Sequence, residues 1–302
     1  MSTLNWITNR HVVSALCAAP ILFSCAYASA EEAAVEPAPA VAAAEPAEPE
    51  PPYTLDFNLG IYSNYMFRGV DLSNGPAVQG GVDWAHSSGF YLGAWFSNID
   101  PDYNGKISAA DADDGISRKG NHLELDLYGG YAYEFENGLG LSVSGVYYAY
   151  PEGHKIGTAG SRDTENSFEA FASVSYKWLT YTYSRVLTDY YGADNKNGRD
   201  GDTKGADYHE LKVDYKLPVG DLNFTTKIAR QNTRHIDGDQ TDFAIGLNRD
   251  FSLPTGGKPL GGFNAGAVYT TTFNVKDESF YVDADGQDVN EDKLWFYVKR
   301  TW

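Results

Sequence analysis

The stretch LWFYVKRTW, residues 294–302, alternates between two kinds of side chain. Counted back by twos from the end, one set is Trp302, Arg300, Val298, Phe296 and Leu294, and the other is Thr301, Lys299, Tyr297 and Trp295. A period of two is typical of a β-strand, whose successive side chains point to opposite faces. The first set is apolar apart from Arg300, so a layer of protein or of lipid must cover it. The sequence therefore predicts a closing strand here.

The composition of the chain favours strands and turns over helices. It contains 22 Tyr, 15 Phe, 6 Trp and 31 Gly among 302 residues, but only 2 Met. Aromatic residues are enriched in strands, and Gly in tight turns. The chain has 23 basic and 41 acidic residues, and its formal net charge of −18 argues against nucleic acid as a partner.

Residues 1–30 have the features of a cleaved secretory signal peptide. Arg10 precedes an apolar run, residues 12–23, and a small-x-small cleavage site follows. Both cysteines, Cys17 and Cys25, lie in this segment, so the exported chain would have no thiol. Lipidation of Cys25 is the alternative.

Residues 31–52 predict a disordered periplasmic spacer. They consist of Ala, Glu, Pro and two Val, and the six prolines prevent a stable helix. Such a segment is extended, at about 3.1 Å per residue. The chain beyond it has no apolar run long enough for a transmembrane helix.

From residue 53 to residue 302 the chain divides into about twelve alternating segments of roughly ten residues. In the first, Leu55 and Phe57 alternate with Asp56 and Asn58. Short and long connections interleave, as expected for a barrel inserted from one side of a membrane. The short ones are 86–89, 136–138, the turn around Trp178, and 218–221; the long ones are 68–75, 98–121, 151–166, 188–206, 232–240 and 274–292, while 250–262 is a longer turn.

These features predict an all-β fold, an antiparallel transmembrane β-barrel of about twelve strands. A soluble barrel of that size would enclose a void too wide for side chains to fill. A two-layer soluble sandwich remains an alternative. In lipid, aromatic residues near strand ends would form interfacial girdles. The candidates are Tyr65, Phe67, Trp84, Tyr147, Trp178 and Trp302.

The closing strand also resembles the signal by which outer-membrane barrels are recognised for insertion, so the barrel assembly machinery is an expected partner. The residues that carry this signal are Leu294, Phe296, Val298 and Trp302. Arg300 departs from the apolar residue usual at its place.

Three stretches, residues 63–100, 123–135 and 138–153, resemble successive blocks of the TorF-type porins, a bacterial outer-membrane family also known as Gcw_chp. The resemblance runs from about residue 55 to the last residue and implies an outer-membrane barrel with pore function, without a defined substrate. Asn64 stands where Asp is common in that family, and residues 100–121 are longer than usual.

Acidic residues dominate the polar face of the predicted strands, which favours cations in the lumen and repels anions. The candidate pore-lining residues are Asp56, Asn58, Asp83, Glu124, Asp126, Glu134, Glu210, Lys212, Asp214, Lys227 and Asp242. We therefore expect passive diffusion of small hydrophilic solutes. Outer-membrane lipid and lipopolysaccharide would surround the barrel. The sequence does not decide whether the protein forms a homo-oligomer.

The alternative function is a non-conducting adhesin or receptor that displays acidic loops, its interior plugged by Tyr62, Tyr128, Tyr148 and their neighbours. Arg68 is either a cation at a pore constriction or a strand-end residue bonded to loop carbonyls or lipid phosphate. No nucleophile and base stand at a recognisable spacing, so we do not expect an enzyme.

Residues 100–111, DPDYNGKISAAD, match the spacing of a calcium-binding loop. The oxygen ligands would come from Asp100, Asp102, Asn104, Ser108 and Asp111, and from the carbonyl of Lys106. Ordinary turn chemistry in an Asp- and Gly-rich segment is the competing interpretation. Calcium in an external loop is the only cofactor that the sequence suggests.

Overall fold

The computed structural model of the protein describes residues 51–100, 122–151, 166–191, 203–283 and 286–302. These residues form fourteen strands and a 3-10 helix. The strands are β1 (Tyr53–Tyr62), β2 (Met66–Phe67), β3 (Val70–Asp71), β4 (Ala77–His86), β5 (Phe90–Asn98), β6 (Leu123–Glu134), β7 (Leu139–Ala149), β8 (Ser167–Tyr176), β9 (Leu179–Val186), β10 (Asp207–Lys216), β11 (Leu222–Asn232), β12 (Gln240–Leu253), β13 (Leu260–Phe273) and β14 (Lys293–Thr301), and the helix is η2 (Glu278–Tyr281). Among the described residues, no helix has the length and apolar character needed to cross a membrane.

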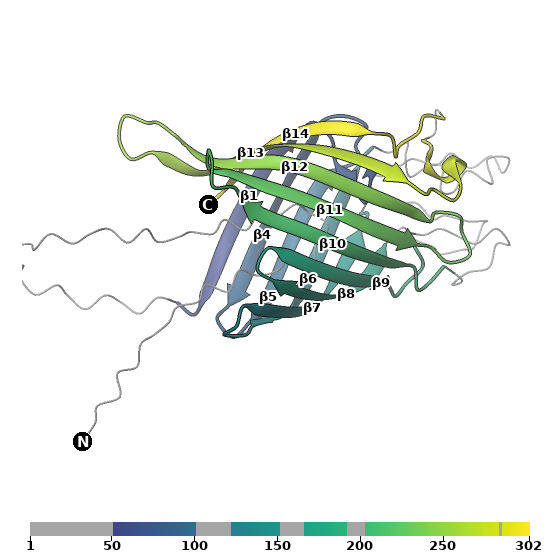
Figure 1. The fold of residues 1–302 in the computed structure, drawn as a ribbon, viewed down its shortest axis with the longest axis horizontal. Helices are drawn as coiled ribbons and strands as arrows, with labels where there is room; N and C mark the ends of the chain where they lie inside the picture. Colours follow the sequence, from purple (N-terminus) through teal and green to yellow (C-terminus); the bar gives the residue numbers. More distant parts are fainter. Residues whose placement is uncertain (1–50, 101–121, 152–165, 192–202, 284–285) are drawn as a thin grey trace, which may run out of the picture.

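Twelve of the strands close into a single antiparallel barrel, which confirms the predicted fold class. Apart from the short strands β2 and β3, strands that follow one another in the chain pair side by side, and β1 closes the ring by pairing with both β4 and β14 (Figure 1). Closure satisfies the backbone hydrogen bonds without an open edge, which a sheet in lipid requires. The two-layer sandwich is excluded because these strands form one closed sheet.

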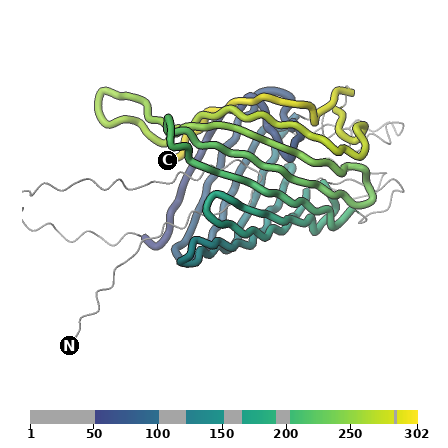
Figure 2. Tube along the Cα trace, viewed as in Figure 1, coloured from purple at the N-terminus to yellow at the C-terminus, as the bar shows by residue number. Residues whose placement is uncertain are grey.

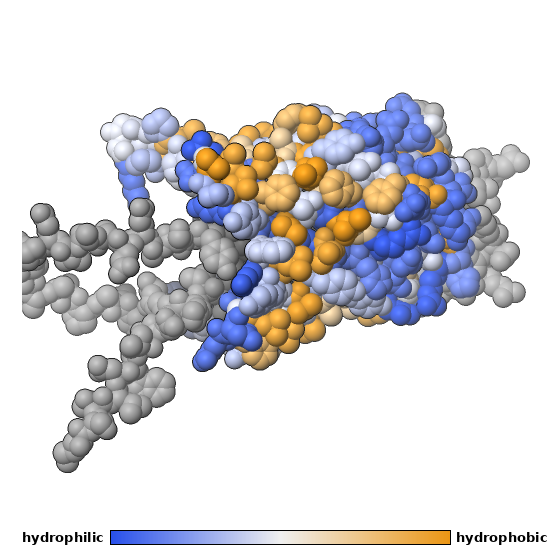
Figure 3. All heavy atoms as spheres, viewed as in Figure 1, coloured by the Kyte–Doolittle hydropathy of each residue, from blue (hydrophilic) through white to orange (hydrophobic). Residues whose placement is uncertain are grey.

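Alternating side chains give the barrel an apolar outer face. On β14, Leu294 and Phe296 are 58% and 52% exposed, whereas Trp295 and Tyr297 are 4% and 6% exposed. Apolar residues gather around the middle of the barrel wall, and hydrophilic residues cover the end with the long connections (Figure 3). Burial of so much apolar surface requires a surrounding apolar medium, and the bilayer provides it.

The two rims of the barrel differ as the spacing of the sequence predicts. Short turns join β4 to β5, β6 to β7, β8 to β9 and β10 to β11 at one rim, and the longer connections leave from the other. The start of β1 and the end of β14 meet at the short-turn rim, where the backbones of Phe57 and Trp302 exchange two hydrogen bonds of 3.0 Å. Outer-membrane barrels place such a rim in the periplasm.

The connection predicted over 250–262 is shorter in the structure. Strand β12 continues to Leu253 and β13 begins at Leu260, so the two strands form a hairpin that extends beyond the rim (Figure 2). The rings of Phe251 and Phe263 stack across it, with centroids 5.4 Å apart. Cross-strand aromatic contact of this kind explains why the strands continue past the barrel wall.

Several predicted features lie outside the described residues. These are the signal peptide, residues 31–50 of the spacer, and the calcium-loop residues Asp102, Asn104, Lys106, Ser108 and Asp111. The first candidate ligand, Asp100, is described, and its backbone N–H donates to the Leu72 carbonyl at 2.7 Å.

Candidate functional site in the barrel interior

Residues 63–76, which join β1 to β4, fold into the barrel and are called the inner segment below. Its two short strands, β2 and β3, form a hairpin. At its tip Arg68 and Gly69 have φ values of 50° and 86°, the positive values that a two-residue type I′ turn requires. Tyr65 and Phe67 are buried inside, at 3% and 8% exposure, so their predicted place in an interfacial girdle is wrong.

An ion pair connects the tip of the inner segment to the barrel wall. One guanidinium nitrogen of Arg68, Nη2, donates to both carboxylate oxygens of Glu169 on β8, at 2.7 and 2.8 Å. The hydroxyl of Ser184 donates to the same carboxylate at 2.6 Å, and that of Tyr148 at 3.1 Å. Burial opposes the charge on Arg68, but the adjacent carboxylate of Glu169 favours it, and the pKa of the guanidinium lies well above its ordinary value.

The structure rules out contact between Arg68 and lipid phosphate, whereas a role as a cation at a pore constriction stays a prediction. The residue lies inside the barrel and away from lipid phosphate, but Glu169 neutralises its charge. The guanidinium also lies over the ring of Tyr208, 4.2 Å from its centroid, and over Phe67 at 4.9 Å. Arg68 therefore acts in this structure as an anchor between the inner segment and the wall.

The tip contacts the opposite wall at Glu169 on β8 and Tyr208 on β10, and it also contacts the nearer strands β12 and β13. Gln240 on β12 donates its side-chain amide to the Arg68 carbonyl at 2.8 Å. A Cβ atom added to Gly69 would lie 2.4 Å from Thr272 on β13, so only glycine fits there without displacement. Since β1 and β4 lie across the ring from β8, β9 and β10, the inner segment crosses the interior.

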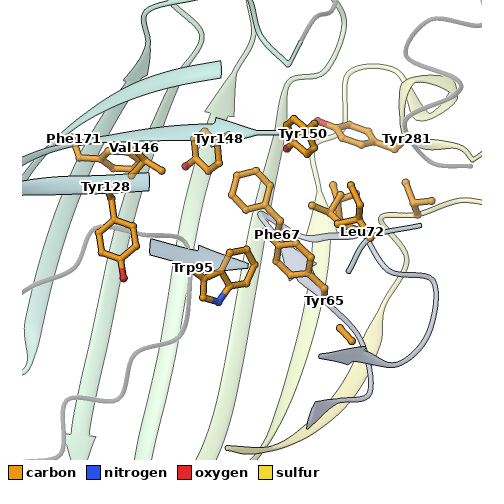
Figure 4. Packing of buried hydrophobic residues seen from close by; sticks show 14 of the residues in the cluster. Tyr65, Phe67, Leu72, Trp95, Tyr128, Val146, Tyr148, Tyr150, Phe171 and Tyr281 are labelled. Carbon is orange, nitrogen blue, oxygen red and sulfur yellow. The ribbon is translucent and has the colours of Figure 1, made fainter. Parts of the chain in front are cut away.

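Aromatic side chains fill the interior on one side of the inner segment. The rings of Tyr65 and Trp95 meet edge to face at 5.3 Å, and Phe67 meets Tyr148 in the same manner at 6.1 Å. Figure 4 shows these side chains gathered together with Tyr128, Tyr150 and Phe171. The outer half of the lumen is therefore packed, and the interior narrows at the level of the inner segment.

Toward the short-turn rim, the inward residues are mostly small and polar. They include Ser142 and Ser144 on β7, Ser173 and Ser175 on β8, Thr180 and Thr182 on β9, and Asn223 and Thr225 on β11. The ring of Tyr128, on the inward face of β6, lies close to Gly93 and donates its hydroxyl to Asp83. The structure thus combines a narrow outer half with a polar inner half.

A second charged group lies on β10, β11 and β12. The ammonium of Lys227 lies 3.2 Å from Glu210 and 2.9 Å from Asp242, and it donates to the hydroxyl of Tyr208 at 2.9 Å. Lys212 pairs with Asp214 at 2.9 Å on the same wall. Five of the candidate residues from the sequence are therefore brought into two neighbouring ion-pair groups: Glu210, Lys212, Asp214, Lys227 and Asp242.

The other candidate residues lie along β1, β4 and β6. Asn58 donates to Asp83 at 3.4 Å, and Asp56 is the register partner of Asp83. Glu134 is exposed at the short-turn end of β6. At the opposite end of that strand, Glu124 and Asp126 are 1% and 0% exposed. A pore-lining role for these residues stays a prediction.

Sequence reasoning missed Glu169 and the inner segment itself. Glu169 follows the inward alternation of β8, so the period of the strand could have identified it. The inner segment carried a weaker signal, the Phe67-Arg68-Gly69 turn flanked by aromatic residues within a long connection. Its partner lies 101 residues away, and local pattern does not reveal such a pairing.

A closed antiparallel barrel with an apolar outer wall and a polar, charged interior defines a transmembrane protein of the bacterial outer membrane. Residues 46–302 match the family described as "Bacterial protein of unknown function (Gcw_chp)", and the chain belongs to that family. This confirms the Gcw_chp part of the resemblance, while the TorF-type name stays a prediction. No curated protein matches the chain.

The chain is similar in structure to several solved proteins. The "NanC porin structure in rhombohedral crystal form" has a TM-score of 0.45 and 10% identity, covering 82% of this chain and 98% of that one. The "KdgM porin in complex with disordered oligogalacturonate" has a TM-score of 0.43 and 6% identity, covering 82% and 97%. The "Salmonella typhi OmpF complex with Daunomycin" has a TM-score of 0.38 and 10% identity, covering 83% and 97%.

Proposed function

We propose that the protein is an outer-membrane channel for passive diffusion of small hydrophilic solutes, with a preference for cations, and that the inner segment sets its narrowest level. The observation that supports this proposal is the polar, charged inner wall of the barrel. A polar, charged inner wall is what a water-filled conduit requires.

The cation preference rests on the balance of charge inside the barrel. Acidic side chains outnumber basic ones on the inward faces of the described strands, and a confined field of one sign concentrates the opposite ions. The acidic residues are Asp56, Asp83, Glu124, Asp126, Glu134, Glu169, Glu210, Asp214, Asp242 and Asp250, and the basic ones are Lys212, Lys216, Lys227, Lys293 and Lys299, to which the inner segment adds Arg68.

The packed outer half favours a second candidate, a non-conducting barrel that displays its long loops. The sequence attributes such a plug to Tyr62, Tyr128 and Tyr148. In the structure Tyr148 packs against Phe67 of the inner segment, whereas Tyr62 stacks on Tyr297, with ring centroids 5.4 Å apart. Any plug would therefore consist chiefly of the inner segment.

Purified barrel folded in detergent, with folding verified by heat-modifiable migration on gels, separates the two candidates. Liposomes that contain the protein are exposed to neutral sugars of increasing size, and swelling reports entry. The channel proposal expects swelling with small sugars that falls as the sugar grows. Liposomes that behave like protein-free controls with every sugar would favour the display barrel.

A variant sharpens the comparison. Replacing residues 66–71 with a short Gly and Ser linker removes the two strands of the inner segment and leaves the wall strands β1 and β4 in place. The proposal expects larger sugars to enter through this variant than through the wild type. An unchanged size limit would show that the inner segment does not set the narrowest level.

A further inference from the structure

We propose that Glu124 and Asp126, on the inward face of β6, form a binding site for a hard divalent cation of the calcium class. The site is distinct from the loop at residues 100–111, and it does not depend on whether the barrel conducts. Its occupant would neutralise two carboxylates that the fold removes from water.

The two side chains lie on the same face of one strand, because residues two apart in a strand point the same way. Glu124 is 1% exposed and Asp126 is 0% exposed. Among the described residues, both carboxylate oxygens of Asp126 and the Oε2 atom of Glu124 are buried without a hydrogen-bond partner. An ionised carboxylate that is buried without a hydrogen bond or a counter-charge is strongly disfavoured unless something compensates it.

Other buried carboxylates on the barrel wall have a compensating cation. Glu169 pairs with Arg68, and Asp242 pairs with Lys227. Glu124 and Asp126 form no ion pair with the basic residues that the structure describes, although they are as deeply buried. The contrast indicates that this pair has a cationic partner from outside the set of described side chains.

The surroundings favour a metal ion with oxygen ligands. The hydroxyl of Tyr65 donates to Glu124 at 3.3 Å, and Tyr150 also contacts that carboxylate. Ser97 and Trp95 are the register partners of Glu124 and Asp126 on β5. Carboxylate, hydroxyl and water oxygens suit calcium. The described residues hold no group of three or more His, Cys, Asp and Glu side chains arranged for a metal, so two charged ligands give weak affinity, roughly 0.1–1 mM.

The proposed cation site would also affect how the inner segment is held against the wall. Tyr65 belongs to that segment, and its ring packs on Trp95, which is the register partner of Asp126. A cation bound by Glu124 and Asp126 would strengthen the contact between the inner segment and β6. Removing the cation would loosen it.

Terbium luminescence tests the proposal in the folded, full-length barrel. Terbium replaces calcium at oxygen sites, and a nearby indole transfers excitation energy to it. We expect wild-type protein excited in the indole band to sensitise terbium, and millimolar calcium to displace the signal. The Trp95→Phe variant should lose most of the emission while calorimetry still shows calcium uptake, because Trp95 is the neighbouring donor.

Two variants and two controls make the result decisive. Asp126→Asn and Glu124→Gln should each weaken terbium and calcium binding at least tenfold, and Asp126→Asn should lose the rise in melting temperature that calcium gives the wild type. Glu136→Gln, in the exposed turn after β6, and Glu278→Gln, at an exposed position on helix η2, should leave the emission unchanged. The proposal would be overturned if both carboxylate variants bound terbium and calcium as tightly as the wild type does. It would also be overturned if the folded wild type gave no sensitised emission.

Discussion

Replacing Arg68 with alanine should release the tip of the inner segment. The side chains of Arg68 and Glu169 are 4% and 0% exposed, so the change leaves a buried carboxylate without its cation. Removing one partner of a buried ion pair costs about 3–5 kcal/mol. The hydroxyls of Ser184 and Tyr148 still donate to Glu169, which favours the lower end of that range.

This energy has a measurable consequence for the position of the inner segment. At about 1.4 kcal/mol for each factor of ten, it shifts the balance between the seated and the released tip by roughly 100-fold to 4,000-fold. Single-channel recording in planar bilayers is the assay. Arg68→Ala should show a larger and more variable open-state current than the wild type.

A double-mutant cycle separates the ion pair from general damage. Removing both charges, with Arg68→Met and Glu169→Gln together, should disturb the current and the urea midpoint of unfolding less than Arg68→Met alone, since no charge is then left buried and unpaired. The reasoning is refuted if Arg68→Ala has the wild-type current and midpoint, or if the effects of the two single changes simply add.

Three further changes test other parts of the interior. Gly69→Ala should raise the conductance by displacing the tip. Gly138→Ala is the control, because Gly138 has a similar positive φ but nothing within 4 Å of an added Cβ, and it should leave the conductance unchanged. Equal currents through the two variants would contradict the contact between Gly69 and the wall. Lys227→Met should increase cation selectivity in bilayer recordings because its two carboxylate partners lose their counter-charge; an unchanged selectivity would place this group outside the ion path. Gly93→Val should destabilise the barrel by about 1–3 kcal/mol, because its Cβ would lie 2.4 Å from the Tyr128 ring. The temperature of heat modification should therefore fall. An unaltered temperature would mean that the ring moves aside without cost.

The barrel wall could be predicted from the sequence because its signal is local. Leu55 and Phe57 face outward and Asn58 faces inward as the period of two requires, and closure by the last strand follows from the same pattern in residues 294–302. The length of the connections also predicted which strand ends share a rim. Both signals depend only on neighbouring residues.

The interior could be predicted only in part, since its contacts join distant residues. Tyr65 and Phe67 have the sequence pattern of an interfacial girdle, and an aromatic residue near a strand end suits a lipid interface and a packed lumen equally. The choice between them depends on Arg68 reaching Glu169, 101 residues further along the chain. Charge pairing within the lumen likewise depends on strand register, which the spacing of the sequence does not determine.

The reversal potential of the purified wild-type channel in a KCl gradient tests the central claim most directly. A barrel whose interior carries more acidic than basic side chains should conduct, and its reversal potential should lie on the potassium side of zero. Raising the salt concentration on both sides should reduce this preference because salt screens the charges. A reversal potential on the chloride side, or no current through protein shown to be folded, would contradict the account.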